Sequence, residues 1–165
     1  MKRLIFFGAI LLLLQSACTG VRPAQLNKLD TLQDKLGLLF PDAEISAIQG
    51  PQGFSESYQI VLNQPLDHAQ PEKGTFKHYM YLSHLDYSKP LVIDTRGYAA
   101  SLNHTEIARL LESNQLIIEY RFNGKSRPTD VPWQYLNSEQ ANEDYHAIVQ
   151  KIKQLYPGPK VFTGI

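Results

Sequence analysis

The sequence predicts an α/β fold built on one mixed β-sheet, from three observations. Two stretches in the first half of the chain alternate polar with apolar residues, which is the pattern of half-buried strands that pair antiparallel. Three later stretches are continuously apolar, as strands buried on both faces of a sheet are. Two helical patterns separate these three stretches, and that alternation predicts parallel strands joined through helices as β-α-β units.

Composition and charge limit the classes of protein to which the chain can belong. It has 165 residues, of which 43% are hydrophobic, so it can bury a core. Sixteen Lys and Arg balance sixteen Asp and Glu, and no basic stripe is present, so we expect no nucleic-acid partner. The five histidines show no HExxH or similar ligand spacing, and we expect neither a metal ion nor a cofactor.

The first 17 residues have the organisation of a signal peptide. A positive start precedes an apolar stretch over residues 4–14, which is too short for an ordinary membrane span. Small residues and then Cys18 follow, which resembles a bacterial lipoprotein signal cleaved before a lipid-modified cysteine, although Gln15 replaces the usual aliphatic residue. The alternative is a plain signal with a cysteine near its cleavage site. Both predict export, either as a cell-envelope lipoprotein of the periplasm or outer membrane, anchored through Cys18, or as a secreted protein.

Residues 18–56 are predicted to form a tether and one amino-terminal helix. Leucines over residues 24–40 recur at spacings of three and four, which favours an amphipathic helix that Gly37 weakens and Pro41 ends. The Gly- and Ser-rich residues 50–57 form a loop. The leucines are Leu26, Leu29, Leu32, Leu36 and Leu39.

The two alternating stretches begin the sheet domain, which we assign to residues 57–165. They cover residues 57–68 and 74–84, and the residues between them are rich in turn formers. Two period-2 stretches joined in this way predict an antiparallel hairpin. Asp67 and His68 lie on its turn, where we expect them to serve local turn chemistry.

The three apolar stretches cover residues 89–95, 114–122 and 160–165. Between the first two, residues 104–113 predict a helix with Asn103 in the capping position. Its buried face would consist of Ile107, Leu110 and Leu111.

The second helical pattern covers residues 137–156 and is the most regular in the chain. We expect Asp144 and His146 on the flanks of its apolar stripe, bonded locally or facing water, and Trp133 before it as a packing residue. The stripe consists of Ala141, Tyr145, Ile148, Ile152, Leu155 and Tyr156.

In open α/β sheets the functional site lies beyond the carboxyl ends of the strands. Residues 94–98, 119–122 and 163–165 occupy those positions here. A glycine at a strand end is what a nucleophile elbow, G-x-S-x-G, requires. Gly164 and Ile165 would be the first two positions of such an elbow, with the serine directly after Ile165.

Four blocks of sequence resemble, in order and spacing, the S37 family of serine peptidases, the prolyl tripeptidyl aminopeptidases of secreted bacterial type. They also resemble, more distantly, the S28 family of prolyl carboxypeptidases and dipeptidyl peptidases. The resemblance runs from Gln64 to Ile165. The blocks are QPLDHAQPEKGTFKHYMYLSH, IDTRGYAAS, NQLIIEYRFNGKSRP and SEQANEDYHAIVQKI.

This resemblance implies an α/β-hydrolase core with a helical cap and a Ser–Asp–His triad, whose nucleophile follows a motif like Thr163–Gly164–Ile165. Residues 57–165 would then be the amino-terminal part of that core. The three triad residues would lie beyond Ile165, and residues 1–165 by themselves would be inactive. Its implied partner is a peptide with a free amino terminus.

Two function classes remain open. The first is an exported serine exopeptidase that releases tripeptides from peptide amino termini, prefers proline at the cleaved position and works through an acyl-enzyme. The second is a non-catalytic envelope lipoprotein with an α/β-hydrolase-like fold, acting as a binding module. The residue after Ile165 discriminates between them.

Gly97 and Tyr98 follow the first apolar strand, where α/β hydrolases take one oxyanion-hole N–H. The Tyr98 N–H is the candidate donor, because glycine permits a close approach of the backbone. The alternative is a turn glycine beside a tyrosine that packs on the cap.

Glu119 and Arg121 end the second apolar strand and are candidate substrate-binding residues. A partly buried carboxylate at Glu119 would suit the α-ammonium of a peptide. The alternative is a structural ion pair, between Glu119 and Arg121 or between loops. Tyr120 stands where the family motif has histidine, and residues 123–128 would line the mouth of the site.

Overall fold

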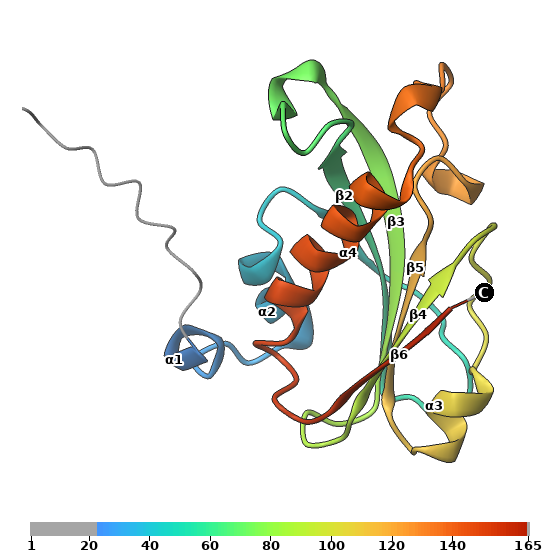
Figure 1. Cartoon of the computed structure of the whole chain (residues 1–165). Helices are drawn as coiled ribbons and strands as arrows, with labels where there is room; N and C mark the ends of the chain where they lie inside the picture. Colours follow the sequence, from blue (N-terminus) through green and yellow to red (C-terminus); the bar gives the residue numbers. More distant parts are fainter. Residues whose placement is uncertain (1–22, 165) are drawn as a thin grey trace, which may run out of the picture.

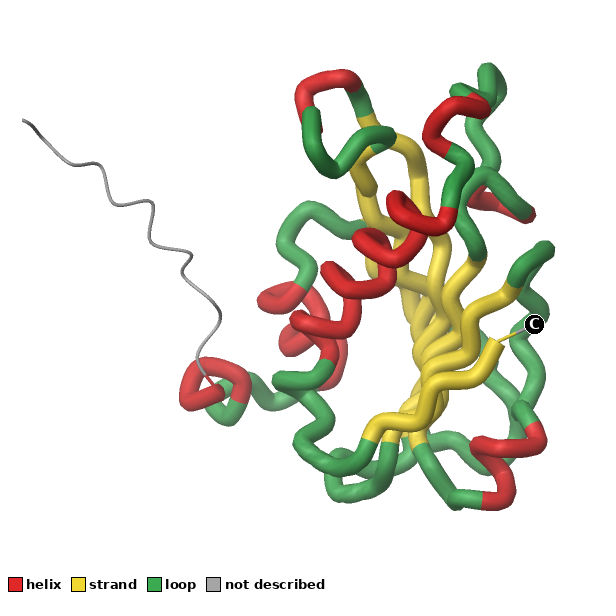
Figure 2. Tube along the Cα trace, in the orientation of Figure 1, coloured by secondary structure: helices red, strands yellow, loops and turns green. Residues whose placement is uncertain are grey.

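The protein is described here from a computed structural model, which covers residues 23–164. A six-stranded sheet runs through the molecule, with helices on both of its faces (Figures 1 and 2). The predicted signal peptide, Cys18 and Ile165 lie outside the described residues. The strands are β1 (Glu44–Ala47), β2 (Glu56–Pro65), β3 (Thr75–His84), β4 (Leu91–Arg96), β5 (Asn114–Glu119) and β6 (Lys160–Gly164).

The sheet is mixed, as the sequence predicted. Its strand order is β1-β2-β3-β5-β4-β6. The first four strands in this order pair antiparallel, whereas β4 is parallel to both β5 and β6. The chain therefore leaves β3, forms β4 one position away, and returns through helix α3 (Glu106–Leu110) to insert β5 between them. The short strand β1 was not predicted, because it has only four residues and none of them is buried.

The predicted hairpin is confirmed as β2 and β3, which pair over ten residues from Glu56↔His84 to Pro65↔Thr75. Its turn closes with the Leu66 N–H donating to the Gly74 carbonyl at 3.0 Å. Because β3 runs antiparallel to β5, this turn lies at the same end of the sheet as the carboxyl ends of β4 and β5. The hairpin turn is distant from those ends in sequence but close to them in space (Figure 1).

One face of the sheet is covered by α2 (Leu32–Leu39) and α4 (Ser138–Ile152), while α3 lies toward the other face (Figure 1). The core between the sheet and its α2 and α4 cover is apolar. No helix within residues 23–164 is long and apolar enough to cross a membrane. Fully buried members of this core include Leu36 of α2, Ile148 and Ile152 of α4, and Ile60, Met80, Ile93 and Ile118 of the strands.

The single helix predicted over residues 24–40 is wrong. The structure has α1 (Pro23–Leu26) and α2, separated by five residues. Thr31 is the reason for the break: its side chain accepts the Asp34 N–H at 3.1 Å and so caps a new helix rather than continuing an old one. The leucine spacing survives such a break, because both short helices turn their leucines toward the same core.

The predicted geometry of helix α3 is also wrong. Its cap is Thr105, which accepts the Ala108 N–H at 3.3 Å, and not Asn103. The Thr105 N–H in turn donates to Gln115 of β5 at 2.8 Å, which fixes the start of the helix so that Ala108 faces the sheet. The expected apolar face points outward as a result, and Leu110 is 80% exposed.

Strand β6 was predicted to be buried on both faces. In the part of the chain that the structure describes, it pairs only with β4, and Phe162 is 56% exposed. The apolar character of this strand is therefore not matched by burial within residues 23–164.

Candidate functional site

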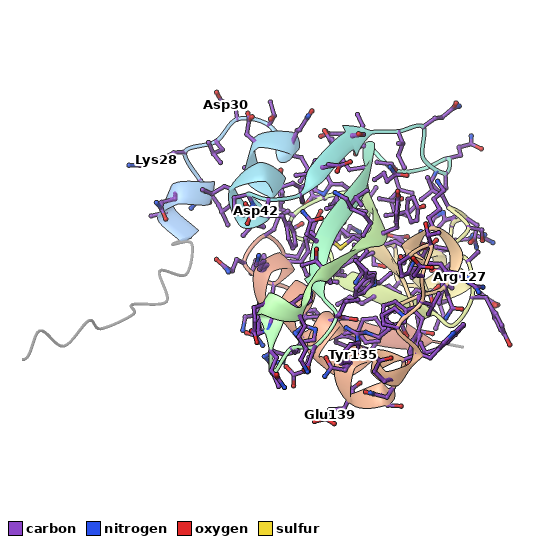
Figure 3. All side chains as sticks on the ribbon, turned by 90° about the horizontal axis from the view of Figure 1, so that it is seen from above. Lys28, Asp30, Asp42, Arg127, Tyr135 and Glu139 are labelled. Carbon is purple, nitrogen blue, oxygen red and sulfur yellow. The ribbon has the colours of Figure 1, made fainter. Side chains whose placement is uncertain are left out.

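The candidate site is the edge of the sheet at which β4, β5 and β6 end. Four segments gather there: the hairpin turn 66–74, the loop 97–104 after β4, the segment 120–137 after β5, and the end of β6 (Figure 1). Seen from above, Arg127 and Tyr135 lie across the molecule from Lys28 and Asp30 near α1 (Figure 3).

Arg121 is fully buried at this edge, and its guanidinium makes a bidentate pair with a carboxylate of α4. Its Nε donates to Asp144 Oδ2 at 2.7 Å, and its Nη2 donates to Oδ1 at 3.0 Å. Asp144 is fully buried as well. A buried guanidinium needs such a countercharge, because an unpaired charge in the protein interior is costly.

The remaining N–H groups of Arg121 bind main-chain carbonyls. Its Nη1 donates to Leu66 O at 3.0 Å and to Tyr135 O at 2.8 Å, and its Nη2 donates to Pro65 O at 3.0 Å. All five guanidinium N–H groups are thus satisfied. Arg121 thereby joins the hairpin turn, the 3-10 helix η3 (Trp133–Tyr135) and α4 to the end of β5.

The prediction for Asp144 is wrong, since it lies in the core of this cluster and not on the flank of α4. The Asp144 carboxylate can lie within the apolar stripe of α4 because it pairs there with the Arg121 guanidinium. His68 of the hairpin turn adds a third group, with Nε2 at 2.7 Å from Asp144 Oδ1. His146 is exposed, as expected, and Asp67 does serve turn chemistry by accepting the Ala69 N–H at 3.0 Å.

Glu119 binds the loops on the other side of β5. Its Oε1 accepts the Ala100 N–H at 3.2 Å, and its Oε2 accepts the N–H and the hydroxyl of Ser126 at 2.8 and 2.7 Å. The side chain is 1% exposed. The alternative ion pair with Arg121 is not formed, because Arg121 pairs with Asp144. Contact of Glu119 or Arg121 with substrate stays a prediction. The geometry favours a structural role for both, in which each side chain holds neighbouring segments together.

Gly124 completes the packing around Glu119 and could not have been identified from the sequence pattern. Its φ is +54°, in the left-handed region that favours glycine. A Cβ at this position would lie 2.6 Å from Glu119 Oε1 and 2.9 Å from the Cα of Ala99. Residues 123–128 were expected to line the mouth of the site, which stays a prediction; among them Ser126 is buried, whereas Gly124, Lys125 and Arg127 are exposed.

The predicted oxyanion loop emerges beside these groups. Gly97 and Tyr98 follow β4 directly, and the Tyr98 side chain is 82% exposed. Within residues 23–164 no group accepts a hydrogen bond from the Tyr98 N–H. Both the oxyanion donor and the alternative, a turn glycine beside a tyrosine that packs on the cap, stay predictions.

Gly164, at the end of β6, is crowded by the neighbouring strand. Thr163 and Gly164 pair with Asp94 and Thr95 of β4. A Cβ on Gly164 would lie 2.4 Å from Thr95 Oγ1, so that this position has no room for a side chain. The pairing also brings the end of β4, after which the loop with Tyr98 begins, beside the end of β6.

His78 lies beneath this edge, on β3. Its Nε2 donates to the main-chain oxygen of Glu119 at 2.6 Å, and its Nδ1 is buried without a partner. Burial lowers the pKa of His78, so the imidazole is neutral in the folded protein. This contact could not be predicted from the sequence, because the alternation of β3 indicates which face of the sheet His78 occupies but not its polar partner.

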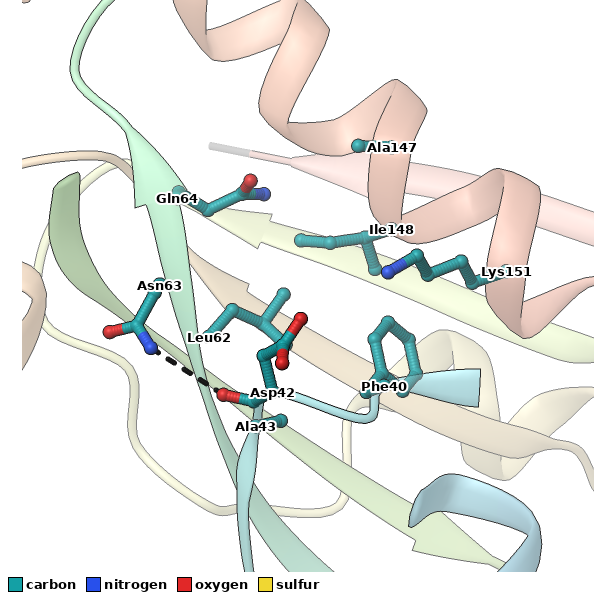
Figure 4. Close-up of a pocket in the computed structure, with 9 residues that line it drawn as sticks. All are labelled: Phe40, Asp42, Ala43, Leu62, Asn63, Gln64, Ala147, Ile148 and Lys151. Carbon is teal, nitrogen blue, oxygen red and sulfur yellow. Dashed lines mark hydrogen bonds between the residues drawn. The ribbon is translucent and has the colours of Figure 1, made fainter. Parts of the chain in front are cut away.

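Hollows of the surface lie both at this edge and away from it. A cavity of about 270 Å³ adjoins the ends of β4 and β6 and is lined in part by Asp94, Arg96 and Thr163. A second hollow, of about 90 Å³, lies between β2 and α4 (Figure 4). No group of three or more potential metal ligands occurs within residues 23–164.

Trp133 was predicted to be a packing residue, and this prediction is wrong. It is 60% exposed, and its ring is contacted by the Arg127 guanidinium at 5.6 Å. Trp133 therefore stands on the surface near the candidate site rather than in the core.

Comparison with known proteins bears directly on this edge. Residues 32–165 match the family model described as PS-10 peptidase S37. The chain belongs to this peptidase family. A prolyl tri/tetrapeptidyl aminopeptidase from Streptomyces mobaraensis is 40% identical to it over 107 residues, which make up 64% of this chain and 22% of that relative. The chain thus spans about a fifth of the relative's length, and both findings support a peptidase function.

The residues of this S37 chain that the structure describes do not assemble a Ser–His–Asp triad. The closest approach is His68 with Asp144, but Arg121 holds both carboxylate oxygens. Within residues 23–164 no serine hydroxyl forms a hydrogen bond with His68. The His68–Asp144 pair is therefore part of the structural cluster around Arg121.

Removing the charge of Asp144 tests this cluster. The Asp144→Asn variant leaves the buried Arg121 without a countercharge, and we expect it to lower the free energy of unfolding by about 3–5 kcal/mol. Chemical denaturation followed by circular dichroism measures this change. Glu143→Gln makes the same chemical change at an exposed neighbouring position and is expected to shift stability by less than about 0.5 kcal/mol. Equal stability of the two variants would contradict the assignment.

The neutral buried His78 predicts a pH dependence of stability. An unfolded histidine takes up a proton below about pH 6.5, whereas the pKa of folded His78 is lowered, so stability is lost as the pH falls through that range. His78→Gln keeps a donor toward Glu119 but cannot titrate. Between pH 7.5 and 5.5 this variant should lose less stability than the wild type, by up to about 1.4 kcal/mol per pH unit. An unchanged slope in His78→Gln would refute the prediction.

Proposed function

We propose that the full-length protein is an exported serine exopeptidase that releases tripeptides from peptide amino termini, with a preference for proline at the cleaved position. The family match and the named aminopeptidase relative support this specificity class. The observation that carries the proposal is geometric. Within residues 23–164 the main-chain N–H of Tyr98 has no acceptor, and Tyr98 follows β4, whose Thr95 pairs with Gly164 at the end of β6, at the edge where open α/β sheets bind ligands.

The proposed mechanism begins with a serine directly after Ile165, on the turn that Gly164 opens, in an α/β-hydrolase core. A histidine base from beyond this segment takes the serine proton, and the oxygen attacks the scissile carbonyl. The Tyr98 N–H and the N–H after the serine stabilise the resulting oxyanion. The protonated histidine then gives its proton to the leaving amine, and water hydrolyses the acyl-enzyme. Residues 1–165 alone would lack these reacting groups and be inactive.

We further propose that the enzyme is held at the cell envelope by a lipid on Cys18, and that plain secretion is the alternative. The signal-like sequence of residues 1–18 supports this. Five peptide steps separate Cys18 from Pro23, a reach of at most roughly 18 Å. A lipid at Cys18 would therefore keep α1 close to the bilayer. Arg127 and Tyr135, at the candidate site, lie across the molecule from the labelled residues near α1 (Figure 3).

A fluorophosphonate probe tests the reaction class. The full-length protein should be labelled on one serine, and labelling should abolish release of tripeptides from a proline-containing peptide with a free amino terminus. Residues 1–165 expressed alone should remain unlabelled. A full-length protein that binds peptide but is neither labelled nor active would instead be the non-catalytic binding module.

If the Tyr98 N–H is the main-chain donor to the oxyanion, its removal should slow catalysis. Tyr98→Pro removes the N–H, and we expect kcat to fall by about 10²–10³-fold. Tyr98→Ala removes the exposed side chain but keeps the N–H, and its kcat should remain within a few-fold of the wild type. Steady-state kinetics on a tripeptide p-nitroanilide compares the two variants. Similar losses in both would rule out the main-chain donor.

A further inference from the structure

We infer that Glu119 is a positioning residue that holds the oxyanion loop in place, rather than an anchor for the substrate ammonium. This inference rests on the proposed function and deepens it. Its basis is that Glu119 contacts three separate segments, namely the loop after β4, the segment after β5 and strand β3.

The loop that carries the Tyr98 N–H is fixed at both of its ends by the end of β5. On one side, the Tyr120 N–H donates to the Arg96 carbonyl at 2.8 Å. On the other side, the Ala100 N–H donates to Glu119 Oε1 at 3.2 Å. Only Gly97, Tyr98 and Ala99 lie between these two bonds. The direction of the Tyr98 N–H is thus set by one main-chain bond and one carboxylate.

The carboxylate is itself held from the opposite direction. The Ser126 hydroxyl accepts the Tyr79 N–H of β3 at 2.9 Å, so its own proton is free to donate to Glu119 Oε2 at 2.7 Å. The Ser126 N–H donates to the same oxygen. Every partner of the carboxylate is therefore a donor, which is the pattern that an ionised carboxylate requires. A continuous chain of hydrogen bonds runs from β3 through Ser126 and Glu119 to the oxyanion loop.

Packing supports the same arrangement. Gly124 lies against both the carboxylate and Ala99, since a Cβ there would be within 2.9 Å of each. The main chain of Glu119 is fixed separately, by His78 at 2.6 Å. Glu119 is consequently confined on every side, and its side chain is almost completely buried. An ammonium anchor has to present its carboxylate to an open pocket, which this one does not.

The two roles of Glu119 predict different kinetics. A positioning residue acts on transition-state stabilisation, so its loss lowers kcat and the reactivity of the serine toward any acylating reagent. An ammonium anchor acts on substrates that have a free amino terminus, and its loss raises KM for those alone. A fluorophosphonate has no amino group, so its rate of reaction reports the oxyanion site without the anchor.

The experiment uses Glu119→Gln in the full-length protein, whose amide cannot accept all three donors in the same way. We expect kcat on a free-amino tripeptide p-nitroanilide and the rate of fluorophosphonate inactivation both to fall about 10–100-fold, with KM within about three-fold of the wild type. Ser126→Ala, which spares the carboxylate, should give a smaller loss of the same kind. Glu139→Gln, an exposed carboxylate on α4, should leave both quantities unchanged.

A rise in KM with an unchanged rate of inactivation would overturn the inference and make Glu119 the ammonium anchor. Wild-type rates in both Glu119→Gln and Ser126→Ala would overturn it as well. Failure of the proposed function gives a different result, because the wild-type protein itself would then react with neither substrate nor probe. If Glu119→Gln does not fold, Ser126→Ala decides between the two roles by the same measurements.

Discussion

The buried positive charge of Arg121 imposes the strictest requirement in this structure. A guanidinium without solvent needs five acceptors and a negative partner, and these come from three segments: the hairpin, η3 and α4. Asp144 supplies the charge, and the hairpin turn and η3 supply three carbonyls. Each segment has one position in which its acceptor reaches Arg121. The arrangement of this edge of the sheet consequently depends on the hydrogen bonds and the charge pairing that Arg121 requires.

Glu119 and Arg121 lie two residues apart at the end of β5, and each binds a different set of segments at this edge. Arg121 gathers the hairpin turn and α4, whereas Glu119 gathers the loops that follow β4 and β5. Opposite charges so near each other in sequence suggested a mutual ion pair. They do not form one, because each is satisfied by a different set of partners. Two independent sets of contacts therefore hold this edge together, one around Arg121 and one around Glu119.

Periodicity was sufficient to predict the elements that bury a regular apolar face. The β2–β3 hairpin, β4, β5 and α4 were all found in this way. It failed for α3, where Thr105 and Gln115 fix the rotation of one helical turn, and for the break at Thr31, because side-chain hydrogen bonds decide both. At the candidate site the strand ends were predicted correctly. The roles of Asp144, His78 and Ser126 were not, since a polar residue in an apolar stripe becomes interpretable only when its partner is known.

The contact of Gly124 with Ala99 and Glu119 also has a genetic consequence. Every missense change of a glycine codon introduces at least a Cβ, and the residue has a backbone conformation that side chains disfavour. Every amino-acid replacement at Gly124 therefore adds at least one atom that would collide with Glu119 or Ala99. The exposed Tyr98 is the opposite case, because the proposed role uses only its main-chain N–H and leaves its side chain unconstrained. Natural variation in this part of the family should be scarce at the first position and abundant at the second.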